Sequence, residues 1–196
     1  MTDWLLALVP TYGLWLIAAS TFASCVALPI PASILMLAAG GFAASGDLVL
    51  GQVILAALSG AVIGDQIGFW LGRRGGAALV DRLSGGPRGR LIGKARSLIE
   101  RRGALAVFFS RWLFSPLGPY INLIGGAMRQ SWGSFTLWAI LGEALWCMIY
   151  ILAGRAAGGN LTAASDMLAS VLGLVATGTV VAGLGWWLLR LARRGE

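Results

Sequence analysis

The stretch 110–128 constrains the fold of this chain most, because it is apolar yet poorly suited to an ordinary helix in lipid. It contains Arg111, Pro116, Pro119 and Asn122. Each proline removes a backbone donor and clashes with the preceding helical turn, and an arginine at the bilayer centre costs roughly 2.5–3.5 kcal/mol on insertion scales. Irregular backbone persists at membrane depth only where protein or a watery cavity surrounds it. We therefore predict a functional site around Arg111.

The rest of the chain is that of an integral membrane protein, since 58% of its 196 residues are hydrophobic and only 12% are charged. Six apolar stretches occur, at 4–24, 28–44, 48–72, 104–128, 132–154 and 167–189. The chain has no histidine, and Cys25 and Cys147 are interpreted as small apolar core residues. We expect a single all-α membrane domain over 1–196, with a C-terminal helix at 167–189 and neither a metal nor a cofactor.

A ladder of glycines runs through the third apolar stretch. These small residues stand four apart and so share one helix face: Gly60, Gly64, Gly68 and Gly72. Such a face lets two helix backbones approach closely, which predicts a packing seam. Packing does not explain Asp65, which lies beside the seam within the same apolar stretch.

Residues 73–103 form the one long polar segment between apolar stretches. Its basic residues are Arg73, Arg74, Arg82, Arg88, Arg90, Lys94, Arg96, Arg101 and Arg102. Apolar residues recur among them at helical spacing, which predicts an amphipathic helix on the anionic cytoplasmic membrane surface. A nucleic-acid interface is the rival interpretation, but no aromatic residues alternate with the basic ones, and we expect no nucleic-acid partner.

Charge also constrains the topology. The tail carries Arg190, Arg193 and Arg194, so positive-inside logic places both the 73–103 segment and the C-terminus in the cytoplasm. Three apolar stretches separate these two basic segments, and three full crossings would put them on opposite sides. One stretch must return to the face it entered, and 104–128, with its prolines, is the candidate.

Two halves of the chain, about 22–76 and 104–159, carry the same features in the same order. The shared features are a proline nine residues before a glycine pair (Pro31 with Gly40-Gly41, Pro116 with Gly125-Gly126), a Gly-acid pair (Gly64-Asp65, Gly142-Glu143) and a Gly-Arg end (Gly72-Arg73, Gly154-Arg155). Such order predicts an internal repeat. Proline-interrupted segments at matching places of inverted halves point to a transport site.

These motifs, together with Leu28-Pro29-Ile30-Pro31, Gly64-Asp65-Gln66-Ile67-Gly68-Phe69 and Phe109-Ser110-Arg111-Trp112, resemble the DedA family, part of the wider VTT group. The resemblance covers roughly residues 20–160. It implies an inverted-repeat bundle of about four transmembrane helices and two re-entrant hairpins, in the bacterial cytoplasmic (inner) membrane. It also implies lipid translocation by a flippase or scramblase, chiefly of undecaprenyl phosphate, with a link to the proton-motive force.

The chain departs from the family pattern at two places. The family usually carries an acidic residue near the first proline motif, where this chain has Ser24, Cys25 and Ser33. It also usually has a second arginine six residues after the first, where this chain has Leu117. Tyr120 and Asn122 are the nearby polar replacements of that arginine, and Glu143 is a candidate to compensate for lost acidity.

Physical reasoning adds a phosphate-binding hypothesis. Proline is favoured in the first helical turn, so Pro31 and Pro119 are expected to start half-helices at mid-membrane. Free N–H groups at such a helix start, and the planar fork of Arg111, suit a lipid phosphate. The substrate-binding candidates are Arg111, Pro31, Pro116, Pro119, Tyr120, Asn122 and Ser33. The alternative is that Arg111 only pairs with Asp65 or Glu143 to hold the bundle together.

Asp65 and Glu143 are also candidates for proton coupling. An acid that meets Arg111 in one conformation and hydrocarbon in the other would bind a proton only in the second. A proton-coupled transporter of a small solute or ion remains an alternative. An enzyme acting on lipid phosphate is disfavoured, because the sequence shows no histidine and no cluster of carboxylates. The expected partners are anionic membrane lipids, and a homo-oligomer stays open.

Overall fold

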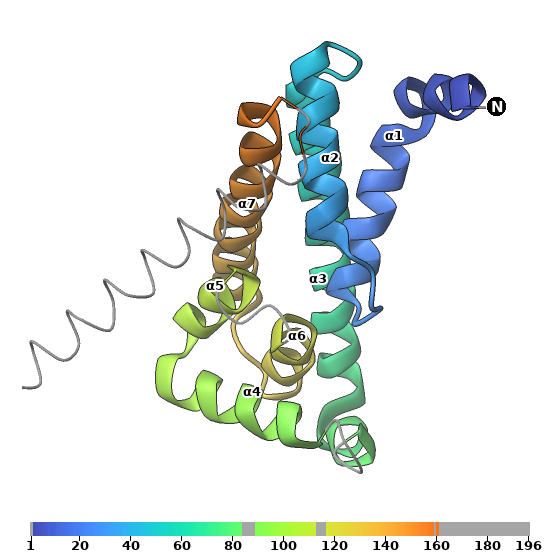
Figure 1. Ribbon diagram of the computed structural model, residues 1–196. Coiled ribbons are helices and arrows are strands. Elements are labelled where there is room, and N and C mark those ends of the chain that lie inside the picture. The colour runs from blue at the N-terminus through green and yellow to red at the C-terminus, as the bar shows by residue number, and fades with distance from the viewer. Residues whose placement is uncertain (1, 84–88, 113–116, 159, 161–196) are drawn as a thin grey trace, which may run out of the picture.

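The computed structural model describes residues 2–83, 89–112, 117–158 and 160, and this part of the chain is helical throughout (Figure 1). The helices are α1 (Thr2–Cys25), α2 (Ala32–Ser45), α3 (Leu50–Leu83), α4 (Gly89–Arg102), α5 (Ala104–Trp112), α6 (Gly118–Ala127) and α7 (Trp132–Ala156). The predicted C-terminal helix 167–189, the basic tail and Pro116 lie outside the described residues.

Two helices within the described part are long and apolar enough to cross a bilayer, namely Leu50–Gly76 of α3 and Trp132–Ala156. At 1.5 Å per residue, both exceed the roughly 30 Å of the hydrocarbon core. The apolar segment Tyr12–Cys25 of α1 and the whole of α2 are shorter, and 14 residues of α2 reach only about 21 Å. Taken by itself, neither the segment Tyr12–Cys25 nor α2 spans the hydrocarbon core.

The short helices are paired, α1 with α2 and α5 with α6. α1 and α2 run side by side and are joined at one end by the turn 26–31 (Figure 1). Pro31 directly precedes α2 and Pro119 is the second residue of α6, so both prolines stand at half-helix starts as predicted. The two re-entrant hairpins implied by the family resemblance were expected at 28–44 and 104–128, and for 28–44 this is wrong. That stretch supplies only one arm, and α1 supplies the other, whereas 104–128 contains both α5 and α6.

The second arm of each hairpin, α2 or α6, packs against the long helix of the other half. A Cβ at Gly40 of α2 would collide with the carbonyl oxygen of Ile151 in α7, and one at Gly126 of α6 would collide with that of Phe69 in α3. The reciprocal contacts match too. These pairs are Gly154 with Leu37 and Gly72 with Leu123. The same backbone-to-backbone contact is therefore made twice, once on each long helix, which supports the predicted internal repeat.

This contact pattern also fixes which residues of the long helices are equivalent. If Gly72 matches Gly154, then Asp65 matches Cys147 rather than Glu143. Asp65 and Glu143 were predicted to occupy matching places in the two halves. In this register, Glu143 lies one helical turn before the residue that matches Asp65. The repeat therefore has one acid on each long helix, but at positions that are not equivalent.

The predicted glycine seam is confirmed, and it serves two partners. Cβ atoms at Gly60 and Gly64 would strike the backbone of α1, whereas those at Gly68 and Gly72 would strike α6. One face of α3 thus receives the end of α1 and the α6 arm of the second hairpin. Both meet α3 near Asp65.

We predict that Gly126→Ala destabilises the protein by about 1–3 kcal/mol, the usual cost of an extra methylene in a packed core. The new Cβ would overlap the Phe69 carbonyl, and backbone yields less easily than a side chain. Gly51→Ala is the matched control, because its Cβ would meet nothing within 4 Å. Thermal unfolding in detergent measures both. Equal melting temperatures would contradict the close contact of α6 with α3.

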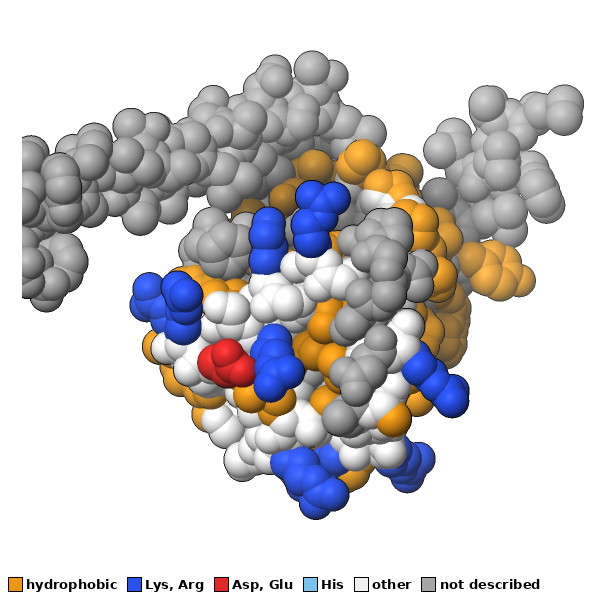
Figure 2. All heavy atoms as spheres, turned by 90° about the horizontal axis from the view of Figure 1, so that it is seen from below, with side chains coloured by type: hydrophobic (Ala, Val, Ile, Leu, Met, Phe, Trp, Pro, Cys, Tyr) orange, Lys and Arg blue, Asp and Glu red, His pale blue; other side chains and the backbone are white. Residues whose placement is uncertain are grey.

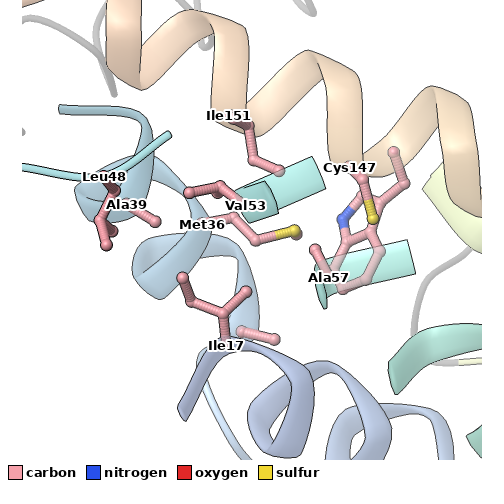
Figure 3. Packing of buried hydrophobic residues seen from close by; sticks show 10 residues of the cluster. Ile17, Met36, Ala39, Leu48, Val53, Ala57, Cys147 and Ile151 are labelled. Atoms are coloured by element: carbon pink, nitrogen blue, oxygen red, sulfur yellow. The ribbon is translucent and has the colours of Figure 1, made fainter. Parts of the chain in front are cut away.

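The core divides into two clusters of buried side chains. In the first, Met36 lies among Val53, Ala57 and Ile151, where α1, α2, α3 and α7 meet (Figure 3). The second joins α4 to α5, α6 and α7 through Ile92, Ala95, Ile99, Val107, Ile121, Ile124 and Phe135. The predicted amphipathic helix is present as α4, but its apolar face packs against protein instead of lying in lipid.

The end of the molecule that holds α4 is basic. Gly76 ends the straight part of α3 with φ 54°, which favours glycine, and the chain then turns across this end (Figure 1). Lys and Arg side chains spread over the surface there (Figure 2). The apolar face of α4 is covered, whereas its basic residues Arg90, Lys94 and Arg101 are exposed.

Candidate functional site

Arg111, on the last turn of α5, lies at the centre of a buried polar cluster to which five helices contribute. The five residues, one from each helix, are Cys25 of α1, Asp65 of α3, Arg111 of α5, Asn122 of α6 and Glu143 of α7. All five are buried, and Arg111 is only 5% exposed. Both hairpins and both long helices therefore meet at one charged point within an otherwise apolar bundle.

The guanidinium of Arg111 is engaged by three side chains through three different nitrogens. Nη1 lies 3.0 Å from Asp65 Oδ1, and Nε lies 3.5 Å from Glu143 Oε1. Nη2 donates a hydrogen bond of 2.6 Å to Asn122 Oδ1, and the Asn122 amide donates one of 2.8 Å to Asp65 Oδ1. The arginine is thus held in a fixed orientation, with its fork directed at acceptors.

The two carboxylates outnumber the one cation in the cluster. One oxygen of each, Asp65 Oδ2 and Glu143 Oε2, is buried and accepts no hydrogen bond. A buried charge is tolerated when it is paired and hydrogen-bonded, and breaking a buried pair costs about 3–5 kcal/mol. The cluster therefore holds Arg111 firmly. With both acids ionised it carries one negative charge that Arg111 does not balance, and a proton would neutralise that charge.

Cys25, near the first proline motif, contacts an acid from the second half of the chain. Its Sγ lies 3.7 Å from Glu143 Oε1. The long helix α7 thus delivers a carboxylate to the end of α1. Cys25 was interpreted as an apolar core residue, and the structure does bury it, but within this polar cluster.

The expectation of no clustered carboxylates is wrong. The ligand atoms of Cys25, Asp65 and Glu143 all lie within 4.8 Å of one another, a spacing that a metal ion can use. Arg111 Nη1, however, already places a positive charge 3.0 Å from Asp65. A divalent cation would have to displace the guanidinium, so this donor set fits a metal poorly.

Two cavities adjoin the cluster. The smaller, of about 40 Å³, is lined by Ser24, Cys25, Ser110, Arg111, Gly118, Pro119, Glu143 and Trp146. It reaches the first turn of α6, where N–H groups lack helical partners and favour an anion. The larger, of about 330 Å³, includes the predicted Pro119 and Tyr120 in its wall.

The remaining predicted site residues lie apart. Pro31 is exposed and Ser33 half-buried at the start of α2, and among the described side chains neither bonds to the cluster or lines these two cavities. The structural glycines hold the helices around the site. Gly64 is packed against Cys25 and Gly68 against Asn122, while Gly125 faces Gln130 and Gly41 is buried in α2.

A second polar network ties α3 to the start of α7 and was not predicted. The Trp132 indole donates to Gln66 Oε1 at 2.8 Å, and the Gln66 amide donates to Thr136 at 3.1 Å. Two turns further along α3, Arg73 Nη1 donates to the Gln130 carbonyl at 3.1 Å. These bonds hold the connection between α6 and α7 against α3.

A helical bundle with long apolar helices, short paired helices and a buried arginine–carboxylate cluster defines a polytopic membrane protein. Residues 30–156 match the family model of the VTT domain, and the chain belongs to this family, the DedA membrane proteins. No solved structure matches it significantly.

The relatives include proteins named as membrane proteins. An uncharacterized membrane protein of Synechocystis, slr0232, is 39% identical over 63% of this chain and 57% of its own length. The Escherichia coli inner membrane protein YohD is 32% identical, covering 79% of this chain and 82% of YohD. The E. coli inner membrane protein YabI is 28% identical over 87% and 68%. The chain thus spans little more than half of the cyanobacterial relative.

Proposed function

We propose that the protein translocates a phosphate-bearing lipid across the bacterial inner membrane, either a polyprenyl phosphate such as undecaprenyl phosphate or a phospholipid. The observation that carries this proposal is the position of Arg111. Its guanidinium is buried where both hairpins meet, yet it borders a cavity that reaches the N-terminus of α6. A planar guanidinium and free helix N–H groups together suit a phosphate.

Binding would proceed by exchange of partners. In the structure, the acceptors of Arg111 are carboxylate and amide oxygens of the protein itself. A phosphate entering the small cavity would replace Glu143, because its 3.5 Å contact is the longest of the three that Arg111 makes with these side chains. Asp65 and Asn122 would keep the guanidinium oriented. Such exchange avoids leaving either the arginine or the head group uncompensated in apolar surroundings.

The arrangement of the hairpins supports alternating access. We infer that α1–α2 and α5–α6 are re-entrant hairpins entering from opposite faces, with the basic α4 end in the cytoplasm. In support of this, α2 and α6 are short helices that start at or next to a proline, and the start of α6 borders the cluster. Movement of one hairpin against its long helix would then open the site to one face at a time.

Labelling of single cysteines placed at Ala104 and Gln130 tests this topology. The two positions flank the second hairpin, so a membrane-impermeant maleimide should modify both from the cytoplasmic face only. The native Cys25 and Cys147 are buried and provide the unlabelled background. Modification of the two positions from opposite faces would exclude a re-entrant α5–α6 hairpin.

The function itself is tested in sealed vesicles containing the purified protein and fluorescent polyprenyl phosphate or phosphatidic acid. We expect the inner-leaflet probe to reach the outer leaflet, where a membrane-impermeant quencher acts on it, faster than in vesicles without protein. The protein should not accelerate the quenching of a probe that lacks the phosphate. The proposal is refuted if vesicles that contain folded protein translocate neither phosphate lipid faster than vesicles without protein. Uptake of a soluble anion instead would favour the small-solute alternative.

A further inference from the structure

The larger cavity beside the ion cluster is mostly apolar and has no part in holding Arg111. Its volume is about 330 Å³, at the lower end of the range for ligand pockets. The turn after α1, the α3 face and the start of α6 form its walls. The lining residues are Cys25, Val26, Ala27, Leu28, Gly68, Leu71, Pro119, Tyr120 and Leu123.

The outer end of this cavity faces the lipid-exposed side of the bundle. Two of the lining residues, Leu28 of the turn after α1 and Leu71 of α3, are 53% and 56% exposed. Both side chains are apolar, so this mouth offers nothing to a hydrated anion. A hydrocarbon chain would enter it from the bilayer without passing through water.

The inner end of the cavity leads to the charged cluster. Cys25 and Pro119 line both this cavity and the small polar one that contains Arg111 and Glu143. Gly68 forms part of the wall, and its missing side chain lets Asn122 approach, since a Cβ there would lie 2.9 Å from Asn122 Cβ. The apolar cavity thus adjoins the small polar cavity, with Cys25 and Pro119 in the walls of both.

We propose that this side cavity binds the hydrocarbon chain of the translocated lipid next to the head group, while the phosphate lies at Arg111. The proposal rests on the proposed function and specifies its substrate as an amphiphile bound at both ends. A second copy of this chain is the weaker occupant, because a protein interface needs a broad complementary surface rather than one narrow cavity. A lipid chain fits both the apolar lining and the charged inner end.

Photo-crosslinking tests this assignment in phosphatidylethanolamine–phosphatidylglycerol vesicles. Two probes are used, a polyprenyl phosphate and a phosphatidic acid, each with a diazirine on the chain close to the head group. We expect at least one probe to label the 26–28 turn, Leu71 or Leu123, and the comparison of probes identifies the chain type. The double variant Leu28→Trp, Leu71→Trp should fill the mouth and lower labelling at least five-fold. Leu55→Trp is the matched control, because Leu55 is a lipid-exposed residue of α3 outside the cavity.

Labelling spread evenly over lipid-exposed positions, or unchanged in the double variant, would overturn the chain site. Efficient disulfide formation between copies carrying Leu71→Cys would also overturn it, in favour of a second copy. The two proposals fail separately. Translocation without labelling in the cavity refutes only the chain site, whereas labelling without translocation by any phosphate lipid refutes only the function.

Discussion

Arg111→Lys should slow translocation of phosphate lipids at least ten-fold, although the positive charge is retained. Arg111 contacts Asp65, Glu143 and Asn122 through three different nitrogens of one planar group. An ammonium is a compact point charge that cannot reproduce this fork or bind a phosphate bidentately. A ten-fold change corresponds to about 1.4 kcal/mol, the order of one charge-assisted hydrogen bond.

The initial rate in vesicles, measured at equal amounts of folded protein, provides the comparison. Arg155→Lys makes the same change at an exposed position of α7 and should keep the native rate. Size-exclusion profiles and melting temperatures separate loss of function from loss of fold. If the lysine variant at 111 translocates at the native rate, Arg111 serves only to hold the bundle together.

The residues that sequence reasoning located correctly are those whose chemistry conflicts with an apolar environment. Arg111, Asp65, Glu143 and Asn122 are polar groups within apolar stretches, and the structure brings all four together. A buried charge needs a partner, so their meeting follows from the cost of leaving any of them alone. The helix starts at Pro31 and Pro119 follow similarly from the geometry of proline.

Other features depend on which helices face one another, and no local pattern contains that information. Cys25 is apolar in sequence terms, and only the packing of α1 against Gly64 places its thiol beside Glu143. The apolar face of α4 is equally suited to lipid and to protein, and the α5–α6 hairpin covers it. The exchange of hairpins between halves likewise appears only in the Gly40–Ile151 and Gly126–Phe69 contacts.

The register of the two long helices bears directly on coupling. Asp65 and Glu143 are not equivalent in the repeat, so one conformational change need not affect them equally. Asp65 has both the shorter contact to Arg111 and the Asn122 amide, whereas Glu143 has the 3.5 Å contact and the Cys25 thiol. Glu143 is therefore the acid that separates more easily from the arginine, and the better candidate to carry a proton.

The largest effect on coupling is accordingly expected from Glu143→Gln and Asp65→Asn together. A carboxylate paired with Arg111 is stabilised as the anion, whereas the same group facing hydrocarbon is stabilised with its proton. The groups that face these acids are Arg111 from α5, Asn122 from α6 and Cys25 from α1. Protonation at low pH would weaken the hold of the acids on Arg111 and free it for phosphate, so acid on the side of uptake should speed translocation.

Initial rates with and without an imposed pH gradient measure this coupling. We expect the wild type to move lipid faster when the uptake side is acidic, Glu143→Gln to lose most of that response, and the double variant to lose it entirely. Glu100→Gln is the control, because Glu100 is exposed and pairs only with Arg96 on its own helix at 3.0 Å. A double variant that keeps both its rate and its response to the gradient would make these carboxylates structural. A variant that keeps its rate but loses the response would place the proton on this cluster and the phosphate on Arg111 alone.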